Sequence, residues 1–146
     1  MEAVIHHTAV TVSDLERSIS FYRHFFGFEV AWSSDAAGVR YEGPLADQVT
    51  GCPGTSQRIV YLKKGADIIE LVEYTPVAGD SSAISPGNVG TMHLWFRVDD
   101  IDWLYEELTA QGYRTHCPPL FNGIGKVMYC RDPDGAVLEV LTNTRV

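Results

Sequence analysis

The chain has 146 residues, of which 45% are hydrophobic and 11% aromatic, and its formal net charge is -8. This length fits one domain, or two small halves that share a core, and the acidic balance argues against nucleic acid, whose phosphates require a basic patch. No apolar run approaches the roughly 20 residues that a membrane span needs, and the N-terminus lacks the basic-then-apolar pattern of a signal peptide. We therefore expect a cytoplasmic protein without a membrane partner.

A strand and then a helix are predicted at the start of the chain. Residues 4–12 alternate between two faces, with His7 on one of them, which is the period of a strand. Asp14 stands where a helix N-cap is needed, apolar residues recur at helical spacing over 15–26, and Gly27 is a natural helix stop.

Three further strands are predicted in the first half. Residues 28–32 and 39–42 have the pattern of two short strands around a turn-rich segment. The segment 43–57 has two Pro and three Gly, which is typical of a loop with room for one helical turn. The segments 58–63 and 68–74 follow as strands, and the aperiodic residues 76–90 are interpreted as a connector.

The second half repeats the first. Residues 91–113 have the same order of His, Val and Asp as the N-terminal segment, with His93 and Asp100 seven residues apart, as His7 and Asp14 are. A helical pattern again follows and ends in Gly112. The rest of this half is predicted as three strands and an irregular stretch, namely strands at 114–116, 126–131 and 136–142, with the irregular stretch at 117–125.

Four residues of metal-ligand type occupy matched places in the two halves. His7 and His93 lie on the first strands, and Glu70 and Glu139 lie on the last ones, each Glu flanked by aliphatic residues. A carboxylate in such a strand is costly unless it is exposed, paired or metal-bound. For any one Glu, exposure on the open face of a sheet is an equally simple interpretation, and a single strand histidine is more often solvated than a ligand. The repetition favours a shared metal site built by all four.

Neighbouring residues compete for these positions. His6 precedes His7, but the seven-residue offset to the helix cap, present in both halves, selects His7. Glu73 should point to the opposite face from Glu70. Imidazole and carboxylate ligands without thiolate suit Zn, Ni, Co, Mn or Fe(II) and leave room for water or substrate; we expect one divalent metal ion per site, with Zn first.

The three cysteines are an odd number without close spacing, which favours free thiols over a disulfide framework. Neither Cys117 nor Cys130 has a base within sequence reach, so neither is expected to be a nucleophile.

Over nearly its whole length the chain resembles the vicinal oxygen chelate superfamily, which includes glyoxalase I, methylmalonyl-CoA epimerase, extradiol dioxygenases and fosfomycin or bleomycin resistance proteins. The resemblance rests on His7 with VSDLERSISFYRHFFGF, on IELVEY with Glu70, on His93 with VDDID, and on DPDGAVLEV with Glu139. It implies an α+β fold with two tandem βαβββ modules, whose mixed sheets curl around a central metal cleft. The modules would span 1–75 and 91–146, joined by the connector 76–90, with His7, Glu70, His93 and Glu139 as ligands.

The resemblance also implies a reaction. Extradiol dioxygenases use two His and one carboxylate, and drug-sequestering relatives often lack the metal ligands, so a full set of four favours the epimerases and glyoxalase I. Both polarise a carbonyl on the metal and move a proton on the adjacent carbon through an enediolate or enolate. We expect an epimerase or isomerase of a cyclitol ketone or acyl-CoA type substrate, with a glyoxalase I-like lactoylglutathione lyase as the alternative and a drug-binding protein as the alternative of another class. Glu70 or Glu139 would carry the proton, in a homodimer.

Several other residues are candidates for contact with a small-molecule substrate. Trp95 and Arg97 share the strand face of His93, and Tyr74 shares that of Glu70. Tyr41, Phe121 and Lys126 come from the irregular stretches, where ordinary loop packing is an equally good interpretation. The loops 43–57 and 117–125 are candidate lids. The length of the connector allows the halves to pair within one chain or to be exchanged between two chains.

Overall fold

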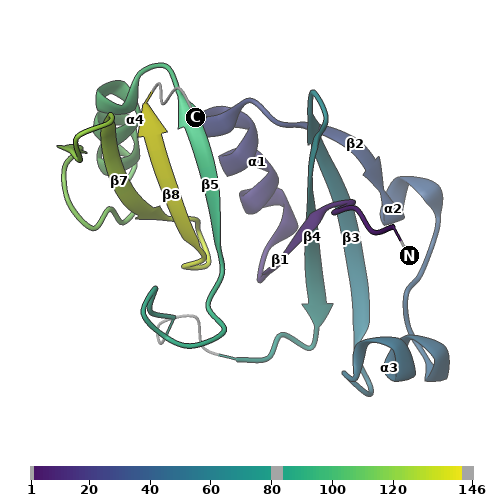
Figure 1. Cartoon of the computed structure of the whole chain (residues 1–146). Coiled ribbons are helices and arrows are strands. Elements are labelled where there is room, and N and C mark those ends of the chain that lie inside the picture. The colour runs from purple at the N-terminus through teal and green to yellow at the C-terminus, as the bar shows by residue number, and fades with distance from the viewer. Residues whose placement is uncertain (1, 80–83, 143–146) are drawn as a thin grey trace. The chain divides into compact units, whose positions relative to one another are not determined.

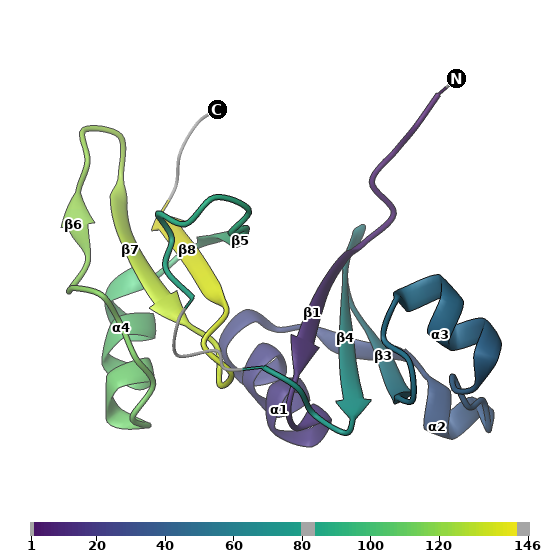
Figure 2. The ribbon, with the colours of Figure 1, turned by 90° about the horizontal axis from the view of Figure 1, so that it is seen from below.

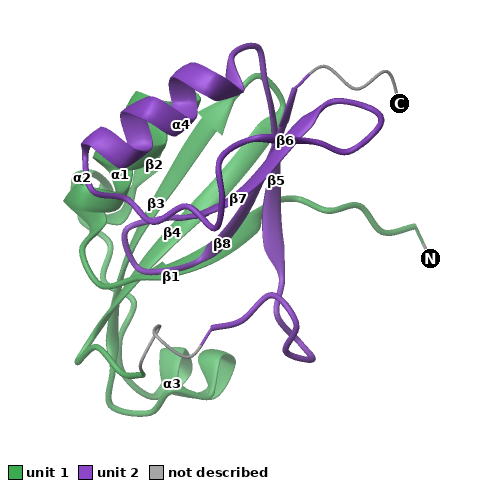
Figure 3. Cartoon of the chain, turned by 90° about the vertical axis from the view of Figure 1, so that its left-hand side faces the viewer, with its two compact units in different colours: residues 1–79 green, residues 80–146 purple. Residues whose placement is uncertain are grey.

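The structure, a computed structural model, describes residues 2–79 and 84–142. The chain divides into two compact units, residues 1–79 and 80–146, so that the boundary falls within the predicted connector (Figure 3).

Unit 1 is an open mixed sheet of four strands in the order β1-β4-β3-β2 (Figure 1). The strand β1 runs parallel to β4, and the other neighbours are antiparallel. The helix α1 packs against β4 and β3 and buries Phe21 and Tyr22. The elements are β1 (Thr8–Val12), α1 (Leu15–Phe26), β2 (Glu29–Ser33), α2 (Ser34–Ala37), α3 (Pro44–Thr50), β3 (Ser56–Lys64) and β4 (Asp67–Thr75).

Unit 2 repeats this topology with the strand order β5-β8-β7-β6. Here β5 is parallel to β8, as Figure 2 shows beside α4. The helix α4 lies against β8 and buries Ile101, Leu104 and Leu108. The elements are β5 (His93–Val98), α4 (Ile101–Ala110), β6 (Leu120–Phe121), β7 (Lys126–Arg131) and β8 (Val137–Thr142). The α+β class and the two βαβββ modules are thus confirmed.

The predicted helix caps are present in both units. The Asp14 side chain accepts a hydrogen bond from the Arg17 backbone N–H, and Asp100 accepts one from that of Trp103, so each helix gains a partner for a free N-terminal donor. Gly27 ends α1 with φ 68°, a left-handed conformation that favours glycine.

Other parts of the prediction need correction. The turn-rich segment after β2 is the short helix α2, because Ser33 caps it and Gly38 ends it in the left-handed region. Residues 39–42 form no strand; Tyr41 makes one isolated bridge with Gln57. The predicted strand at 114–116 is likewise reduced to a bridge between Thr115 and Cys130. The 43–57 loop contains α3.

No helix within the described residues is both long and apolar enough to span a membrane.

Candidate metal centre

In unit 1, His7 and Glu70 meet across the parallel pair β1–β4. His7 directly precedes β1, and Glu70 pairs with Ala9, two residues further on. Because alternate residues of a strand share a face, both side chains lie on the same side of the sheet. The Nε2 atom of His7 lies 3.3 Å from Oε2 of Glu70, whose side chain is only 14% exposed. The competitor His6 contacts the other ring nitrogen, with its Nδ1 2.8 Å from Nδ1 of His7.

Unit 2 builds the same pair at the same register. Glu139 of β8 pairs with Trp95 of β5, again two residues after the histidine. The Nε2 atom of His93 lies 3.0 Å from Oε2 of Glu139, and the Glu139 side chain is 22% exposed. The two units thus hold equivalent His–Glu pairs.

Glu73 is engaged elsewhere. Its carboxylate accepts hydrogen bonds from the backbone N–H of Leu15 at 2.9 Å and from Nη1 of Arg58 at 3.1 Å. It therefore supports the start of α1 rather than the His7–Glu70 pair.

Each pair has the geometry of two neighbouring metal ligands. Donor atoms bound to one metal at about 2.1 Å lie about 3.0 Å apart at a right angle and about 3.4 Å apart in a tetrahedron. The observed 3.3 and 3.0 Å fall within this span. In the part of the chain that the structure describes, no three His, Cys, Asp or Glu side chains form a group that could hold a metal ion. Each unit by itself thus offers two candidate ligands, one His and one Glu.

Two tyrosines that the sequence analysis missed stand beside the glutamates. Tyr61 of β3 pairs with Glu70, and Tyr129 of β7 pairs with Glu139. The Tyr129 hydroxyl donates a hydrogen bond to Oε2 of Glu139 at 3.2 Å. Burial, and next the adjacent glutamate, raise the pKa of each phenol, so both remain protonated donors at neutral pH.

Of the predicted substrate residues in unit 1, Tyr74 lies on β4, four residues after Glu70. Burial raises the pKa of Tyr74, and Cys52 and Glu70 raise it further, which places that hydroxyl within the influence of the carboxylate. Tyr41 is 38% exposed, and its phenol adds, after burial and Glu70, to the raised pKa of Tyr61.

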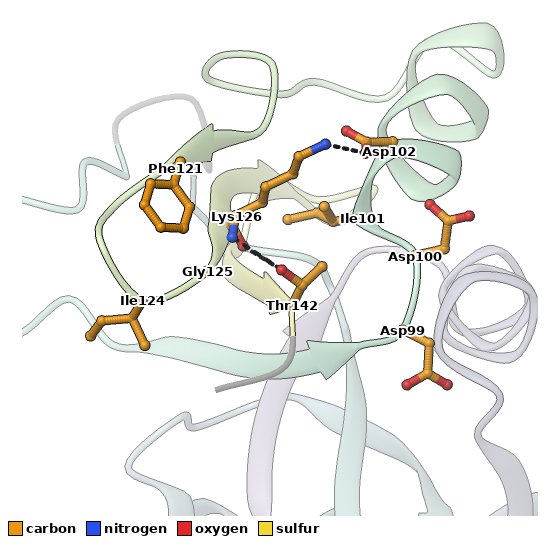
Figure 4. A pocket seen from close by; sticks show the side chains of 9 residues that line it. All are labelled: Asp99, Asp100, Ile101, Asp102, Phe121, Ile124, Gly125, Lys126 and Thr142. Atoms are coloured by element: carbon orange, nitrogen blue, oxygen red, sulfur yellow. Dashed lines mark hydrogen bonds and ion pairs between the residues drawn. The ribbon is translucent and has the colours of Figure 1, made fainter. Parts of the chain in front are cut away.

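In unit 2 the predicted residues separate into two groups. Trp95, 45% exposed, and Arg97, also exposed, follow His93 at alternate positions of β5. Phe121 and Lys126 instead line a hollow of about 420 Å³ beside the start of α4 (Figure 4). His93 begins β5, whereas this hollow adjoins Asp99 and Asp100, just after the strand ends. In that hollow Lys126 forms an ion pair with Asp102.

The Cys130 thiol is fully buried, and burial raises its pKa to about 12. It is therefore a thiol rather than a thiolate at neutral pH, as expected for a cysteine that is not a nucleophile.

Comparison with known proteins identifies the family. The model of the Glyoxalase/Bleomycin resistance protein/Dioxygenase superfamily matches residues 4–140, and the chain belongs to this superfamily. The resemblance found in the sequence is thereby confirmed.

Two curated relatives are enzymes. A 2-epi-5-epi-valiolone epimerase from Actinomyces is 35% identical over 112 residues, which cover 73% of this chain and 58% of the epimerase. The chain thus matches little more than half the length of that relative. A lactoylglutathione lyase from Pseudomonas aeruginosa is 26% identical over 96% of this chain and 82% of the lyase.

Solved structures share the fold. A glyoxalase family protein from Bacillus cereus has a TM-score of 0.79 at 22% identity and covers 94% of this chain and 92% of its own. A fosfomycin resistance protein from Listeria monocytogenes, in complex with Mn(II), has a TM-score of 0.67 at 20% identity, covering 99% and 94% of the two chains.

Proposed function

We propose that this protein is a divalent-metal-dependent epimerase or isomerase that moves a proton on the carbon next to a carbonyl group. The proposal is carried by one observation, the pair of equivalent His–Glu contacts at 3.3 and 3.0 Å in the two modules. Two His and two Glu form a ligand set that suits Zn, Ni, Co, Mn or Fe(II).

The ligands would be His7, Glu70, His93 and Glu139, brought to one ion either within a single chain or between the two chains of a homodimer. When bound, the metal would act as a Lewis acid on the substrate carbonyl, which makes the adjacent C–H more acidic.

The carboxylates of Glu70 and Glu139 would do the proton transfer. Both are largely screened from solvent, and each lies beside a phenol that remains protonated at neutral pH. One carboxylate would remove the proton from carbon, and the opposite glutamate, in its protonated form, would return a proton to the other face. The result is inversion at that carbon through an enolate or enediolate of the substrate.

The epimerase is preferred over a lyase on the strength of the relatives. The 35% identity to the valiolone epimerase favours a cyclitol ketone as substrate. A glyoxalase I-like lyase is the second candidate, because the lactoylglutathione lyase matches 96% of this chain. Both reactions begin with the same proton removal, and they differ in whether the substrate is a glutathione hemithioacetal.

Solvent exchange tests the proposal. Metal-loaded protein is incubated in D₂O with cyclitol ketones, acyl-CoA thioesters and the methylglyoxal–glutathione adduct, and deuterium at the carbon is followed by NMR. We expect exchange with a ketone, its loss on chelation, and its return with added Zn, Ni, Co or Mn. Protein that binds metal but exchanges no such proton would refute the proposal. Tight binding of a ligand that is indifferent to chelators would instead indicate a sequestering protein.

Mixed variants decide how the ligands are shared. If each site combines the first module of one chain with the second module of the other, a dimer of one Glu70→Gln and one Glu139→Gln subunit contains one site with all four ligands. Co-expression with two different tags would then restore part of the activity. If each site lies within one chain, the mixed dimer has no intact site and remains inactive.

A further inference from the structure

Four side chains of unit 2 stand in one row across the sheet. Trp95 pairs with Glu139, which pairs with Tyr129. His116 comes next, because its backbone N–H donates to the Tyr129 carbonyl at 2.8 Å. The row thus extends from the candidate ligand Glu139 to Tyr129 and His116, which are not themselves candidate ligands.

Tyr129 contacts both candidate ligands of its unit. Its hydroxyl donates to Oε2 of Glu139 at 3.2 Å, the same oxygen that faces Nε2 of His93. Its ring packs edge-on against His93, with centroids 5.5 Å apart and planes at 66°. One tyrosine therefore limits rotation of the carboxylate and of the imidazole together.

His116 contacts the Tyr129 ring, and Arg131 in turn binds His116. The His116 ring stacks on it at 6.0 Å with an interplanar angle of 23°. Nε of Arg131 donates to Nε2 of His116 at 3.0 Å, which leaves the ring proton on Nδ1. Arg131 is 5% exposed and also donates to the Gly135 carbonyl at 2.8 Å. The chain of contacts ends in a fixed, buried side chain.

Unit 1 has the same arrangement with a different last member. Tyr61 pairs with Glu70 and has its ring 5.5 Å from that of His7. Trp32 pairs with Tyr61 on the far side, at a ring distance of 5.5 Å. The recurrence of Tyr beside His and Glu in two divergent modules indicates that the tyrosine belongs with the ligand pair and is not incidental packing.

We propose that Tyr129, supported by His116 and Arg131, is a positioning residue that fixes the Glu139 carboxylate for metal binding and proton transfer. The inference rests on the proposed metal centre. Hydrogen bonds from outside the ligand set orient metal ligands, and their loss costs about 10- to 100-fold in metal affinity or activity. Without the phenol, Glu139 keeps its place on β8 but gains rotational freedom.

The test is Tyr129→Phe, which removes one hydroxyl and keeps the ring. Co(II) binding is measured by competition with a chelator, together with the visible spectrum of the Co(II) protein, and thermal unfolding is recorded alongside. Tyr105→Phe on α4, a half-buried tyrosine outside the row, is the matched control. We expect Tyr129→Phe to weaken Co(II) binding about 10- to 100-fold and to change the spectrum, while the control leaves both unchanged.

The outcomes separate this inference from the proposed function. A Tyr129→Phe protein with wild-type Co(II) affinity and spectrum overturns the inference, even if its unfolding temperature falls, because that is the result of a purely structural role. If affinity falls but the wild type exchanges no substrate proton, the positioning role stands and the proposed reaction fails. If the wild type is active, we expect Tyr129→Phe to lower kcat far more than it changes KM. Wild-type protein that binds no Co(II) overturns both.

Discussion

The two modules agree in the row of paired residues that contains the candidate metal ligands, and they differ three residues away from it. Three positions before Tyr61 stands Arg58, and three before Tyr129 stands Lys126. Three positions after Glu70 and Glu139 stand Glu73 and Thr142. In unit 1, Arg58 forms ion pairs with Glu16, Asp35 and Glu73, at 2.6, 2.8 and 3.1 Å.

The corresponding place in unit 2 is the hollow beside α4. Lys126 forms an ion pair with Asp102, and the shorter Thr142 accepts a hydrogen bond from the Lys126 backbone N–H at 3.0 Å. A long charged pair fills the space in one module, and a short hydroxyl leaves it open in the other (Figure 4). The two modules therefore share the His, Glu and Tyr of the row, whereas their polar contacts beyond the row differ.

Glu139→Gln and Glu70→Gln test the row and should have the largest effects. The amide keeps the shape of the side chain but can neither accept the proton nor supply a carboxylate ligand. We expect proton exchange to fall by about 10²- to 10⁴-fold in each variant, the usual contribution of a general base. NMR exchange rates and elemental analysis of bound metal measure this. Full activity in either variant would show that the modules are not equivalent.

Arg58→Met tests the ion-pair cluster that only unit 1 has at this position. It leaves three carboxylates together and removes one of the two hydrogen bonds that hold Glu73. We expect the free energy of unfolding to fall by about 2 kcal/mol, typical of lost hydrogen bonds between charged groups. Urea titration measures the change. The matched control is Arg23→Met, whose partner Glu29 is 71% exposed, and its effect should stay below about 0.5 kcal/mol.

Gly125→Ala tests the start of β7. A Cβ there would lie 2.4 Å from the Thr142 backbone oxygen, whereas the equivalent position of β3 accommodates Gln57. Overpacking against backbone should cost about 1–2 kcal/mol of unfolding free energy. Gly87→Ala, where no atom lies within 4 Å of the added Cβ, is the control and should be neutral or slightly stabilising. Equal stability of the two variants would mean that β7 and β8 separate more readily than their register indicates.

The row ends at His116 in unit 2 and at Trp32 in unit 1. For this difference we expect the smallest effect, which is on the pH dependence of stability. Burial, and then Arg131 and Arg114, lower the pKa of His116 below the ordinary histidine value of 6.5, whereas Trp32 does not titrate. The unfolded chain therefore binds this proton more readily, and stability is lost as the pH falls below about 6.5. In His116→Gln this part of the loss should disappear. Urea midpoints of both proteins between pH 5 and 8, at about one-unit steps, measure it, and parallel curves would contradict the pKa shift.

Much of the fold could be predicted because the repeat supplies two versions of each signal. The caps Asp14 and Asp100 and the alternation in the strands are local patterns, and the structure contains them. The helix α2 was missed because Ser, Asp and Ala in a short segment serve a turn as well as one helical turn.

The candidate site was only partly predictable. The His and Glu residues repeat at matched places, but Tyr61 and Tyr129 precede their glutamates by nine and ten residues. Only the observed strand pairing places each tyrosine opposite its glutamate, although this near-match in spacing was a usable signal. The position of Lys126 could not be predicted, because its ion pair with Asp102 depends on how α4 packs on the sheet of unit 2, and no repeated sequence pattern indicates this.

The shared row also determines where residues can be inserted into this chain. Adding one residue within any of these strands would turn its ligand, tyrosine or aromatic partner to the other face of the sheet. The separation between His and Glu is nevertheless 17 residues larger in the first half than in the second. The helices α2 and α3 lie between β2 and β3, outside the paired strands, with Leu45 and Val49 of α3 facing solvent. This segment is therefore the natural place to insert a tag, a reporter or a new loop without disturbing the register of the ligands.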